Sequence, residues 1–390
     1  MKRRRRGQGL AVALLVAAAV AVVAFSIHLK RQALRGALID QLDHRTPSVA
    51  YTAAVRLIED GGLSAERAAQ LLTERSGKNP GYFASIGRLQ DGEDRMSVET
   101  AADLRRALVE EALGYQALAD IKATSAMEFV GRLLSALDIA AVNSPDPAVD
   151  RALYARVVQK LRARFPLTPE QRGRLIGEMK LIPRGEFQLD GQKVEMHGFE
   201  IGVHEVTRGQ YRTFLSGDEV SRDDDTLPMD ATIYMARSFA AGLGARLPTA
   251  AEWQFAASGG GRFSSSRPCG ERITELERFA WLNEGGIPNR PPTLYPVGTK
   301  APCLGLHDLY GNVAEVTAEW STHGRRLSFG PAADGPVDAW SPRAPMGTAN
   351  KVTLGGDARD TASAAASART VVRRPPNRTT GIRLARDPPR

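Results

Sequence analysis

Cysteine and histidine are scarce in this chain of 390 residues, which has only two cysteines and six histidines. The two cysteines, Cys269 and Cys303, are separated by 33 residues, and neither belongs to a CxxC pair or a Cys/His cluster. A zinc site built from such pairs is therefore not indicated. The sequence also lacks a Gly-x-x-x-x-Gly-Lys-Ser/Thr motif, which excludes a phosphate-binding loop of that type.

The two cysteines leave two interpretations open. If they lie outside the cytoplasm, they can form a disulfide that closes a 35-residue ring. Loop-closure estimates give such a bridge roughly 3 to 4 kcal/mol of stabilisation. Otherwise they are two buried, unpaired thiols, because the sequence cannot supply the Cα separation that a disulfide requires.

Acidic residues are outnumbered by basic ones, and the formal net charge is +8. Much of this excess comes from one block, Lys2 to Arg6, at the start of the chain. No basic face is distributed along the rest of the sequence, and no nucleic-acid-binding motif is present. We therefore expect no nucleic-acid partner.

Charged residues are absent from residues 10–29. In a helix that rises about 1.5 Å per residue, this segment is long enough to cross the roughly 30 Å hydrocarbon core of a bilayer. Residues 1–30 are therefore predicted to be a cytoplasmic basic tip followed by a transmembrane anchor. A cleaved signal peptide is the alternative, but Phe25-Ser26-Ile27-His28 is a poor small-x-small cleavage site.

Basic residues are distributed unevenly around this segment. Five precede it, and Lys30, Arg31 and Arg35 follow it. The positive-inside rule places the N-terminus in the cytoplasm and the residues after 30 outside. The prediction is a single-pass protein of a bacterial-type inner membrane whose C-terminal domains lie in the periplasm.

Residues 31–178 are predicted to form a helical domain or stalk. Thr46-Pro47 combines an N-cap with proline at the first helical position, and this helix is expected to end at Gly61-Gly62. Thr168 to Gln171 has the capping-box signature of a last short helix. Further apolar residues at helical spacing begin at Ser64 and occur in residues 97–118, 126–141 and 147–164. We expect these apolar stripes to form a bundle core.

The stretch from Gly305 to Glu315 (GLHDLYGNVAE) concentrates turn-forming residues and two carboxylates. Asp308 and Glu315 are seven positions apart, and Gly311-Asn312 between them can fold the backbone so that main-chain carbonyls point to one centre. This pattern is typical of calcium binding. It is equally compatible with a buried turn in which both acids cap backbone N–H groups.

Five short motifs occur in order along the second half of the chain. They are MKLIPRGEF from Met179, EVTRGQY from Glu205, ARLPTAAEW from Ala245, YPVG from Tyr295 and the stretch that begins at Gly305. This order resembles the formylglycine-generating enzyme family, also called sulfatase-modifying factors, over residues 179–387. The resemblance implies the α+β fold class, with a C-type lectin-like domain at residues 179–390 that follows the helical region and the transmembrane helix.

The resemblance also implies a structural calcium ion. Carried over position by position, its ligands are the side chains of Asp308 and Glu315 and the main-chain carbonyls of Gly311 and Val313. A second calcium site of the family would at best use Asn283, where the spacing is altered, so we assign no ligand there.

The oxidase activity of the family depends on two cysteines that bind copper, because Cu(I) needs soft sulfur ligands. Counting onward from Gly355-Gly356 places Asp360 and Ala365 at the positions of these cysteines. Neither side chain can hold Cu(I), and Cys269 and Cys303 lie in other motifs. No copper is expected, and formylglycine formation is expected to be absent.

Related members of the family hold iron through a His-x-x-x-His-x-Glu triad on a helical partner domain. The histidines of this chain, at positions 28, 44, 197, 204, 307 and 323, include no pair with that spacing. The iron-enzyme interpretation therefore fails. His197 and His204 flank a predicted strand pair, and we expect them to be exposed or satisfied in the core rather than to bind metal.

Two functions remain open from the sequence. The first is a membrane-anchored, non-catalytic module outside the cytoplasm that binds a protein or glycan partner. The second is an oxidoreductase of the formylglycine-generating family or an enzyme of altered mechanism, with Asp357, Arg359 and Asp360 forming a polar site where the cysteines would be. Because no histidine accompanies these acids, a solvated loop is the simpler interpretation.

Overall fold

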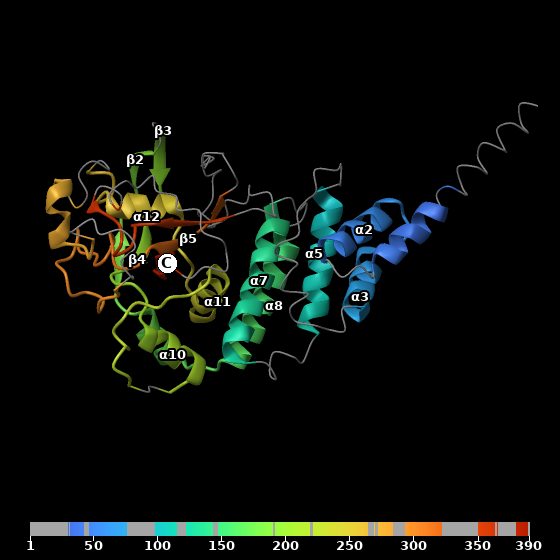
Figure 1. The fold of residues 1–390 in the computed structure, drawn as a ribbon, viewed down its shortest axis with the longest axis horizontal. Coiled ribbons are helices and arrows are strands. Elements are labelled where there is room, and N and C mark those ends of the chain that lie inside the picture. The colour runs from blue at the N-terminus through green and yellow to red at the C-terminus, as the bar shows by residue number, and fades with distance from the viewer. Residues whose placement is uncertain are drawn as a thin grey trace, which may run out of the picture.

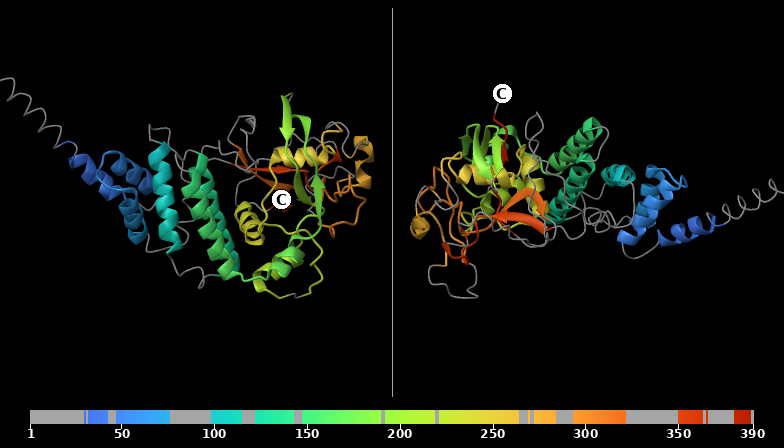
Figure 2. Two further views of the ribbon diagram at one scale, coloured as in Figure 1. Left: turned by 180° about the vertical axis from the view of Figure 1, so that it is seen from behind. Right: turned by 90° about the horizontal axis from the view of Figure 1, so that it is seen from above.

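The computed structural model shows a helical region at one end of the molecule and a mixed α/β domain at the other (Figure 1). The same arrangement appears from behind and from above (Figure 2). The structure describes residues 30, 32–42, 47–75, 98–114, 122–142, 147–189, 192–218, 221–263, 269, 272–283, 293–321, 350–362, 365 and 380–388.

The helices of the helical region follow the predicted segments closely. They include α2 (Pro47–Glu59), α3 (Ala65–Arg75), α5 (Val98–Leu113), α7 (Ala123–Val142), α8 (Pro147–Arg164) and α9 (Pro169–Ile176). Residues 32–41 are helical as well, which the sequence patterns did not predict. The predicted helix of residues 97–118 ends earlier than expected. Its last turn closes at Gly114, whose N–H donates to the carbonyls of Glu110 and Glu111, and residues 115–118 lie outside the described residues.

The capping box predicted at Thr168 is confirmed. Its hydroxyl accepts the backbone N–H of Gln171 at 3.1 Å, and the Gln171 side chain accepts the backbone N–H of Thr168 at 2.8 Å. The same reciprocal pair starts α10 (Arg208–Ser216) at Thr207 and α12 (Ala250–Ala257) at Thr249. Each box satisfies two N–H donors that a helix start leaves open, so local sequence alone fixes these helix starts.

The described strands of the α/β domain form small antiparallel sheets. One has the order β1 (Met179–Ile182), β4 (Phe199–Gly202), β7 (Ala385–Arg386), so the end of the domain pairs with its beginning. Two-stranded sheets join β2 (Gly185–Leu189) to β3 (Gln192–Met196) and β5 (Glu315–Ser321) to β6 (Asn350–Leu354). Around them lie α10, α11 (Ile233–Leu243), α12 and the 3-10 helix η2 (Ile273–Arg278). The predicted helical region followed by a mixed domain is confirmed.

None of the helices that the structure describes is both long enough and apolar enough to span a bilayer. The segment predicted to do so, residues 10–29, lies outside the described residues. The membrane anchor stays a prediction.

The two cysteines form a disulfide, with their Cα atoms 5.0 Å apart. Of the two interpretations left open by the sequence, the structure therefore has the disulfide and not the pair of free thiols. Directly after the bridge, the backbones of Cys303 and Leu306 exchange two hydrogen bonds of 2.7 and 2.9 Å. The disulfide thus fixes the chain just before the predicted calcium turn.

A single hydrophobic core runs from the helical region into the α/β domain. It joins buried side chains of α2, α3, α5, α7 and α8 to those of α10, α11 and β5. Helix α7 lies beside α11 (Figure 1), where the buried hydroxyl of Ser238 donates to the carbonyl of Met127 at 2.7 Å and Thr232 donates to Glu128. The two predicted domains therefore share one core across the boundary predicted at residue 178.

Gly131 allows α7 and α11 to approach this closely. A Cβ atom built on Gly131 would lie 1.9 Å from the carbonyl oxygen of Tyr234, far inside van der Waals contact. In the next position, the guanidinium of Arg132 lies over the ring of Tyr234, 4.1 Å from its centroid. The absence of a side chain at Gly131 therefore allows the short distance between the helical region and the α/β domain.

We expect Gly131→Ala to destabilise the protein by about 3 kcal/mol, because the added methyl group must displace the backbone of α11. Gly173→Ala on α9 is the matched control, since a Cβ atom there meets nothing within 4 Å. Helix propensity predicts that this control gains about 0.5 to 1 kcal/mol. Urea unfolding of both variants measures the difference, and equal stability of the two would contradict the close approach.

Candidate functional site

The turn between Asp308 and Glu315 is built on backbone conformations that most residues avoid. The φ angle is 54° at Asp308, 76° at Gly311 and 51° at Asn312, all in the left-handed region. A Cβ atom on Gly311 would lie 2.1 Å from the carbonyl oxygen of Trp281. Glycine at this position therefore lets the turn fold tightly against the segment that carries Trp281.

Glu315, the first residue of β5, is fully buried and forms an ion pair with the equally buried Arg383. Nη2 of Arg383 lies 2.5 Å from Oε1 of Glu315, and Nε lies 3.0 and 2.9 Å from the two carboxylate oxygens. Trp253 of α12 donates its indole N–H to Oε2 of Glu315 at 2.6 Å. Both oxygens of this carboxylate are therefore engaged by protein donors.

The other donors of Arg383 are used by backbone carbonyls. Nη1 donates to Gly202 and Val203 at 2.9 and 3.0 Å, and Nη2 donates to His307 at 2.7 Å. Burial disfavours the charged guanidinium, but the charge and hydrogen bonds of Glu315 outweigh it and raise the pKa of Arg383. One side chain thus connects the end of β4, the turn and the start of β5.

Two further carboxylates are buried in this region, and each has one oxygen without a hydrogen-bond partner. Asp308 accepts the backbone N–H of Gly298 on Oδ2 at 2.7 Å, and its Oδ1 has no partner. Glu205 accepts the side-chain amide of Asn312 on Oε2 at 2.9 Å, and its Oε1 has none. Both residues are only 1% exposed. Such oxygens are rare in protein interiors and point to a missing partner.

Burial raises the pKa of Glu205 well above its ordinary value. The negative charges of Asp308 and Glu315 raise it further, whereas Arg383 and the hydrogen bond from Asn312 oppose the rise. A carboxylate at position 205 is therefore stabilised too little by its protein neighbours to ionise as easily as it would in water.

Two histidines lie beside these acids. The rings of His204 and His307 stack with their centroids 4.5 Å apart, and Nδ1 of His204 is buried without a partner. Burial lowers the pKa of His204, and the charges of His307 and Arg383 add to this effect. His197, at the opposite end of β4, is exposed.

The structure brings Asp308 and Glu315 into one turn, but it commits the carboxylate of Glu315 to other groups. A calcium ion would have to compete with the guanidinium for this carboxylate, or use the free oxygens nearby. Within the described part of the chain, no three side chains of His, Cys, Asp or Glu are grouped to hold a metal ion. The calcium site predicted at Asp308, Gly311, Val313 and Glu315 stays a prediction.

The loop of Asp357 and Asp360, the alternative site, binds its own charged groups. Arg359 donates to both oxygens of Asp357, from Nε to Oδ1 at 2.9 Å and from Nη2 to Oδ2. Asp360 accepts the backbone N–H of Asp357 at 2.8 Å. A Cβ atom on Gly356 would lie 2.9 Å from Oδ2 of Asp360 and 3.0 Å from Cα of Ala365. Asp360 and Ala365, the two positions at which we expect the family's copper-binding cysteines, therefore both lie beside Gly356.

Asn283, considered for a second calcium site, supports this loop instead. Its backbone N–H donates to the carbonyl of Asp360 at 3.0 Å, and its side-chain amide donates to the carbonyl of Arg359 at 3.4 Å. The side chain is used as a backbone cap.

Sequence reasoning did not place Glu205 or Trp253 in the site. Each lies inside one of the short motifs, and its place in that motif was the available signal. No spacing rule connects them to Glu315 and Arg383, because they meet only through the tertiary fold.

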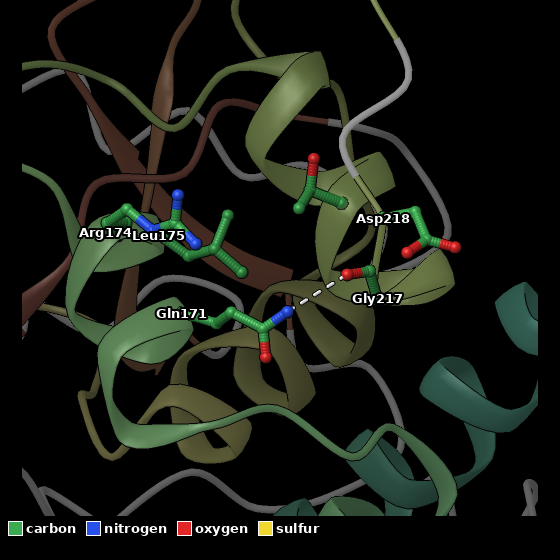
Figure 3. Close-up of a pocket in the computed structure, with 6 residues that line it drawn as sticks. Gln171, Arg174, Leu175, Gly217 and Asp218 are labelled. Carbon is green, nitrogen blue, oxygen red and sulfur yellow. Dashed lines mark hydrogen bonds between the residues drawn. The ribbon is translucent and has the colours of Figure 1, made fainter.

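A small pocket of about 240 Å³ lies between α9 and α10 (Figure 3). It is lined by Gln171, Arg174, Leu175, Thr213, Gly217 and Asp218. The side-chain amide of Gln171 donates to the carbonyl of Gly217 at 3.2 Å across this junction. The pocket is lined by both a basic residue, Arg174, and an acidic one, Asp218, so its charge favours neither anionic nor cationic ligands.

Comparison with known proteins identifies similar sequences for the second half of the chain. Residues 165–388 match the sulfatase-modifying factor enzyme 1-like domain. A protein from Chlamydia pneumoniae named serine/threonine-protein kinase pkn1 is 29% identical in an alignment of 234 residues, and the match covers 47% of this chain and 36% of that protein. The chaperone protein LppX of Paenibacillus barcinonensis is 37% identical in an alignment of 92 residues, and the match covers 20% of this chain and 33% of that protein.

The chain therefore spans about a third of the length of these two relatives. Among solved structures, PvdO from Pseudomonas aeruginosa is 19% identical with a TM-score of 0.41, and the match covers 54% of this chain and 94% of that chain.

We expect Arg383→Met to destabilise the protein by about 3 to 5 kcal/mol, because Glu315 would remain buried without its cation. Arg383→Lys should recover only part of this loss, since an ammonium group cannot bind the carboxylate and three carbonyls at once. The control is Arg386→Met, which removes a partly exposed pair with Glu200 and should cost less than about 1 kcal/mol. Urea unfolding compares the three variants. If Arg383→Met proved as mild as the control, the domain would not depend on this pair.

Proposed function

Residues 165–388 belong to the sulfatase-modifying factor enzyme 1-like domain family, and we propose that this protein is a non-catalytic member of it. In this proposal the protein is a membrane-anchored module that acts outside the cytoplasm by binding a protein or glycan partner. The state of its two cysteines is the observation that carries the proposal.

Copper-dependent formylglycine formation needs two thiolates to hold Cu(I). The chain has two cysteines, and both are used in the disulfide between Cys269 and Cys303. The positions that correspond to the cysteines of the family hold Asp360 and Ala365. No cysteine thiolate is left for copper, and we infer that the reaction has been lost while the domain has been retained.

An enzyme of altered mechanism at Asp357 and Asp360 has less support. Asp357 is paired with Arg359, and Asp360 caps the backbone of the same loop. These contacts give both acids a local structural role, which is sufficient to explain their presence. We therefore place the function of the protein in binding rather than in chemistry at this loop.

The location outside the cytoplasm rests on the charge-free segment of residues 10–29 and on the disulfide. Disulfides persist in oxidising compartments such as the bacterial periplasm and are rare in the cytosol. The described chain begins at the far end of the helical region, and the α/β domain lies at the other end (Figure 2). With the predicted anchor in an inner membrane, the helical region would hold the α/β domain away from the bilayer on the periplasmic side.

The loop-rich end around η2 is the surface that we propose to meet the partner. There the half-buried rings of Trp281 and Tyr295 stack with centroids 3.9 Å apart, and Nζ of Lys300 lies 4.3 Å from the centre of the Trp281 ring. Large amphipathic rings are enriched in interfaces because they bury much area with few rotatable bonds. This composition suits a protein or glycan surface better than nucleic acid.

A structural calcium ion at the turn belongs to the same proposal. Asp308 keeps one buried oxygen without a protein donor, which supports a bound cation. Hard oxygen ligands are those that Ca²⁺ prefers, and the ion would stabilise the turn without taking part in a reaction.

The loss of activity is tested directly with the purified full-length protein. We expect no conversion of a cysteine-containing sulfatase peptide to formylglycine in the presence of copper and oxygen, as measured by mass spectrometry. A copper-binding member of the family serves as the positive control. Copper-dependent conversion by this chain would overturn the non-catalytic assignment.

The proposed location is tested in cells. The full chain should remain in the membrane fraction after a high-salt wash, and a chain without residues 1–30 should not. Peptide mapping without reductant should recover Cys269 linked to Cys303. Recovery of both residues as free thiols from freshly blocked cells would contradict a location outside the cytoplasm.

A further inference from the structure

Three buried carboxylates share one buried guanidinium at the centre of the α/β domain. Glu205, Asp308 and Glu315 are each at most 1% exposed, and Arg383 is fully buried. Ionised together, the three acids and the one cation leave two negative charges unbalanced. Buried charges are normally paired or coordinate a metal ion.

The unbalanced charge belongs to Glu205 and Asp308. Arg383 and Glu315 neutralise each other through three short contacts. The indole N–H of Trp253 donates a further hydrogen bond to the carboxylate of Glu315. Each of the other two acids has one oxygen hydrogen-bonded and one buried oxygen with no partner. These two oxygens are the observation that points to a ligand.

The contacts around these acids place them next to each other. The backbone N–H of His307 donates to the carbonyl of Val203 at 2.9 Å, so the segments that lead to Asp308 and Glu205 run side by side. The residues immediately before the two acids, His204 and His307, stack ring on ring.

One short segment fixes both acids. Its Gly298 N–H binds Asp308, and its Tyr295 is bound through both backbone groups by the side chain of Asn312, at 3.0 and 3.2 Å. The same amide of Asn312 donates to Glu205. Asp308 and, through Asn312, Glu205 are therefore held by one hydrogen-bond network, which is the preorganisation that a metal site requires.

We propose that a divalent cation with a preference for oxygen, such as Ca²⁺, binds between Oε1 of Glu205 and Oδ1 of Asp308, while Glu315 stays with Arg383. This inference rests on the calcium ion proposed above and changes its carboxylate ligands, with Glu205 in the place of Glu315. It does not depend on the proposed partner. A hard cation would balance the charge of the cluster and join the segments of residues 203–205, 295–298 and 307–312.

Calcium binding is measured on the full-length protein in detergent after treatment with a chelator. We expect saturating CaCl₂ to raise the melting temperature by roughly 5 °C or more, as ligand linkage predicts for a site with sub-millimolar affinity. Terbium chloride provides a second measurement, since Tb³⁺ bound near the indole of Trp253 should show luminescence on excitation of tryptophan.

Isosteric variants identify the ligands. Glu205→Gln and Asp308→Asn keep the shape of the side chain but remove its charge, and each should weaken calcium binding at least tenfold. Glu315→Gln should lower the melting temperature without calcium yet keep the calcium-induced rise. Glu200→Gln on β4, an acid that pairs with Arg386, is the matched control and should behave as the wild type. If Glu205→Gln does not fold, Glu205→Asp keeps the charge, draws the carboxylate back and should also weaken binding.

Two results would overturn the inference. If Glu315→Gln abolishes the calcium response and Glu205→Gln keeps it, the ligands are those of the turn itself, and the proposed calcium ion survives with Glu315. If neither CaCl₂ nor MgCl₂ changes the melting temperature of the wild type, no cation is bound, and the free oxygens are balanced by a proton. In that case the proposed calcium ion fails as well, whereas the proposed partner binding is unaffected.

Discussion

The buried ion pair between Glu315 and Arg383 connects elements of the α/β domain that are far apart in the sequence. Removing both charges from water is costly, and the cost is offset only when each remaining donor and acceptor finds a partner. Arg383 meets this condition through Glu315 and the carbonyls of Gly202, Val203 and His307. The end of β4, the turn and the start of β5 must therefore keep their relative positions.

The surrounding features follow from this constraint. The turn presents the carbonyl of His307 to Arg383, and its backbone is in the left-handed region at Asp308, Gly311 and Asn312. The disulfide to Cys303 fixes the chain just before the turn. Within the turn, Gly311 packs against the backbone of Trp281. The position of Asp308 beside Glu205 is thus a consequence of how the arginine is satisfied.

Local signals account for what could be predicted from the sequence. The capping box at Thr168 and the proline at the start of α2 act within a few residues, and the helices begin where these residues place them. The cysteine bridge and the partner of Glu315 could not be derived in this way, because they depend on distances between segments that are remote along the chain. The sequence indicated that the turn carries several oxygen ligands for a metal ion. It could not indicate that Arg383 binds one of these ligands, the carboxylate of Glu315, because the two residues meet only in the folded chain.

The contact between Gly131 and Tyr234 bears on how the protein could have evolved. Helices α7 and α8 precede the start of the matched family region at residue 165, yet they cover the face of α11 that carries Tyr234, Ser238 and Gly242. A gene rearrangement that transferred only the family region would carry this face uncovered into its new host. The helical segment and the domain are therefore expected to be inherited as one unit, and a bulkier residue on either helix would have to be matched by a change on the other.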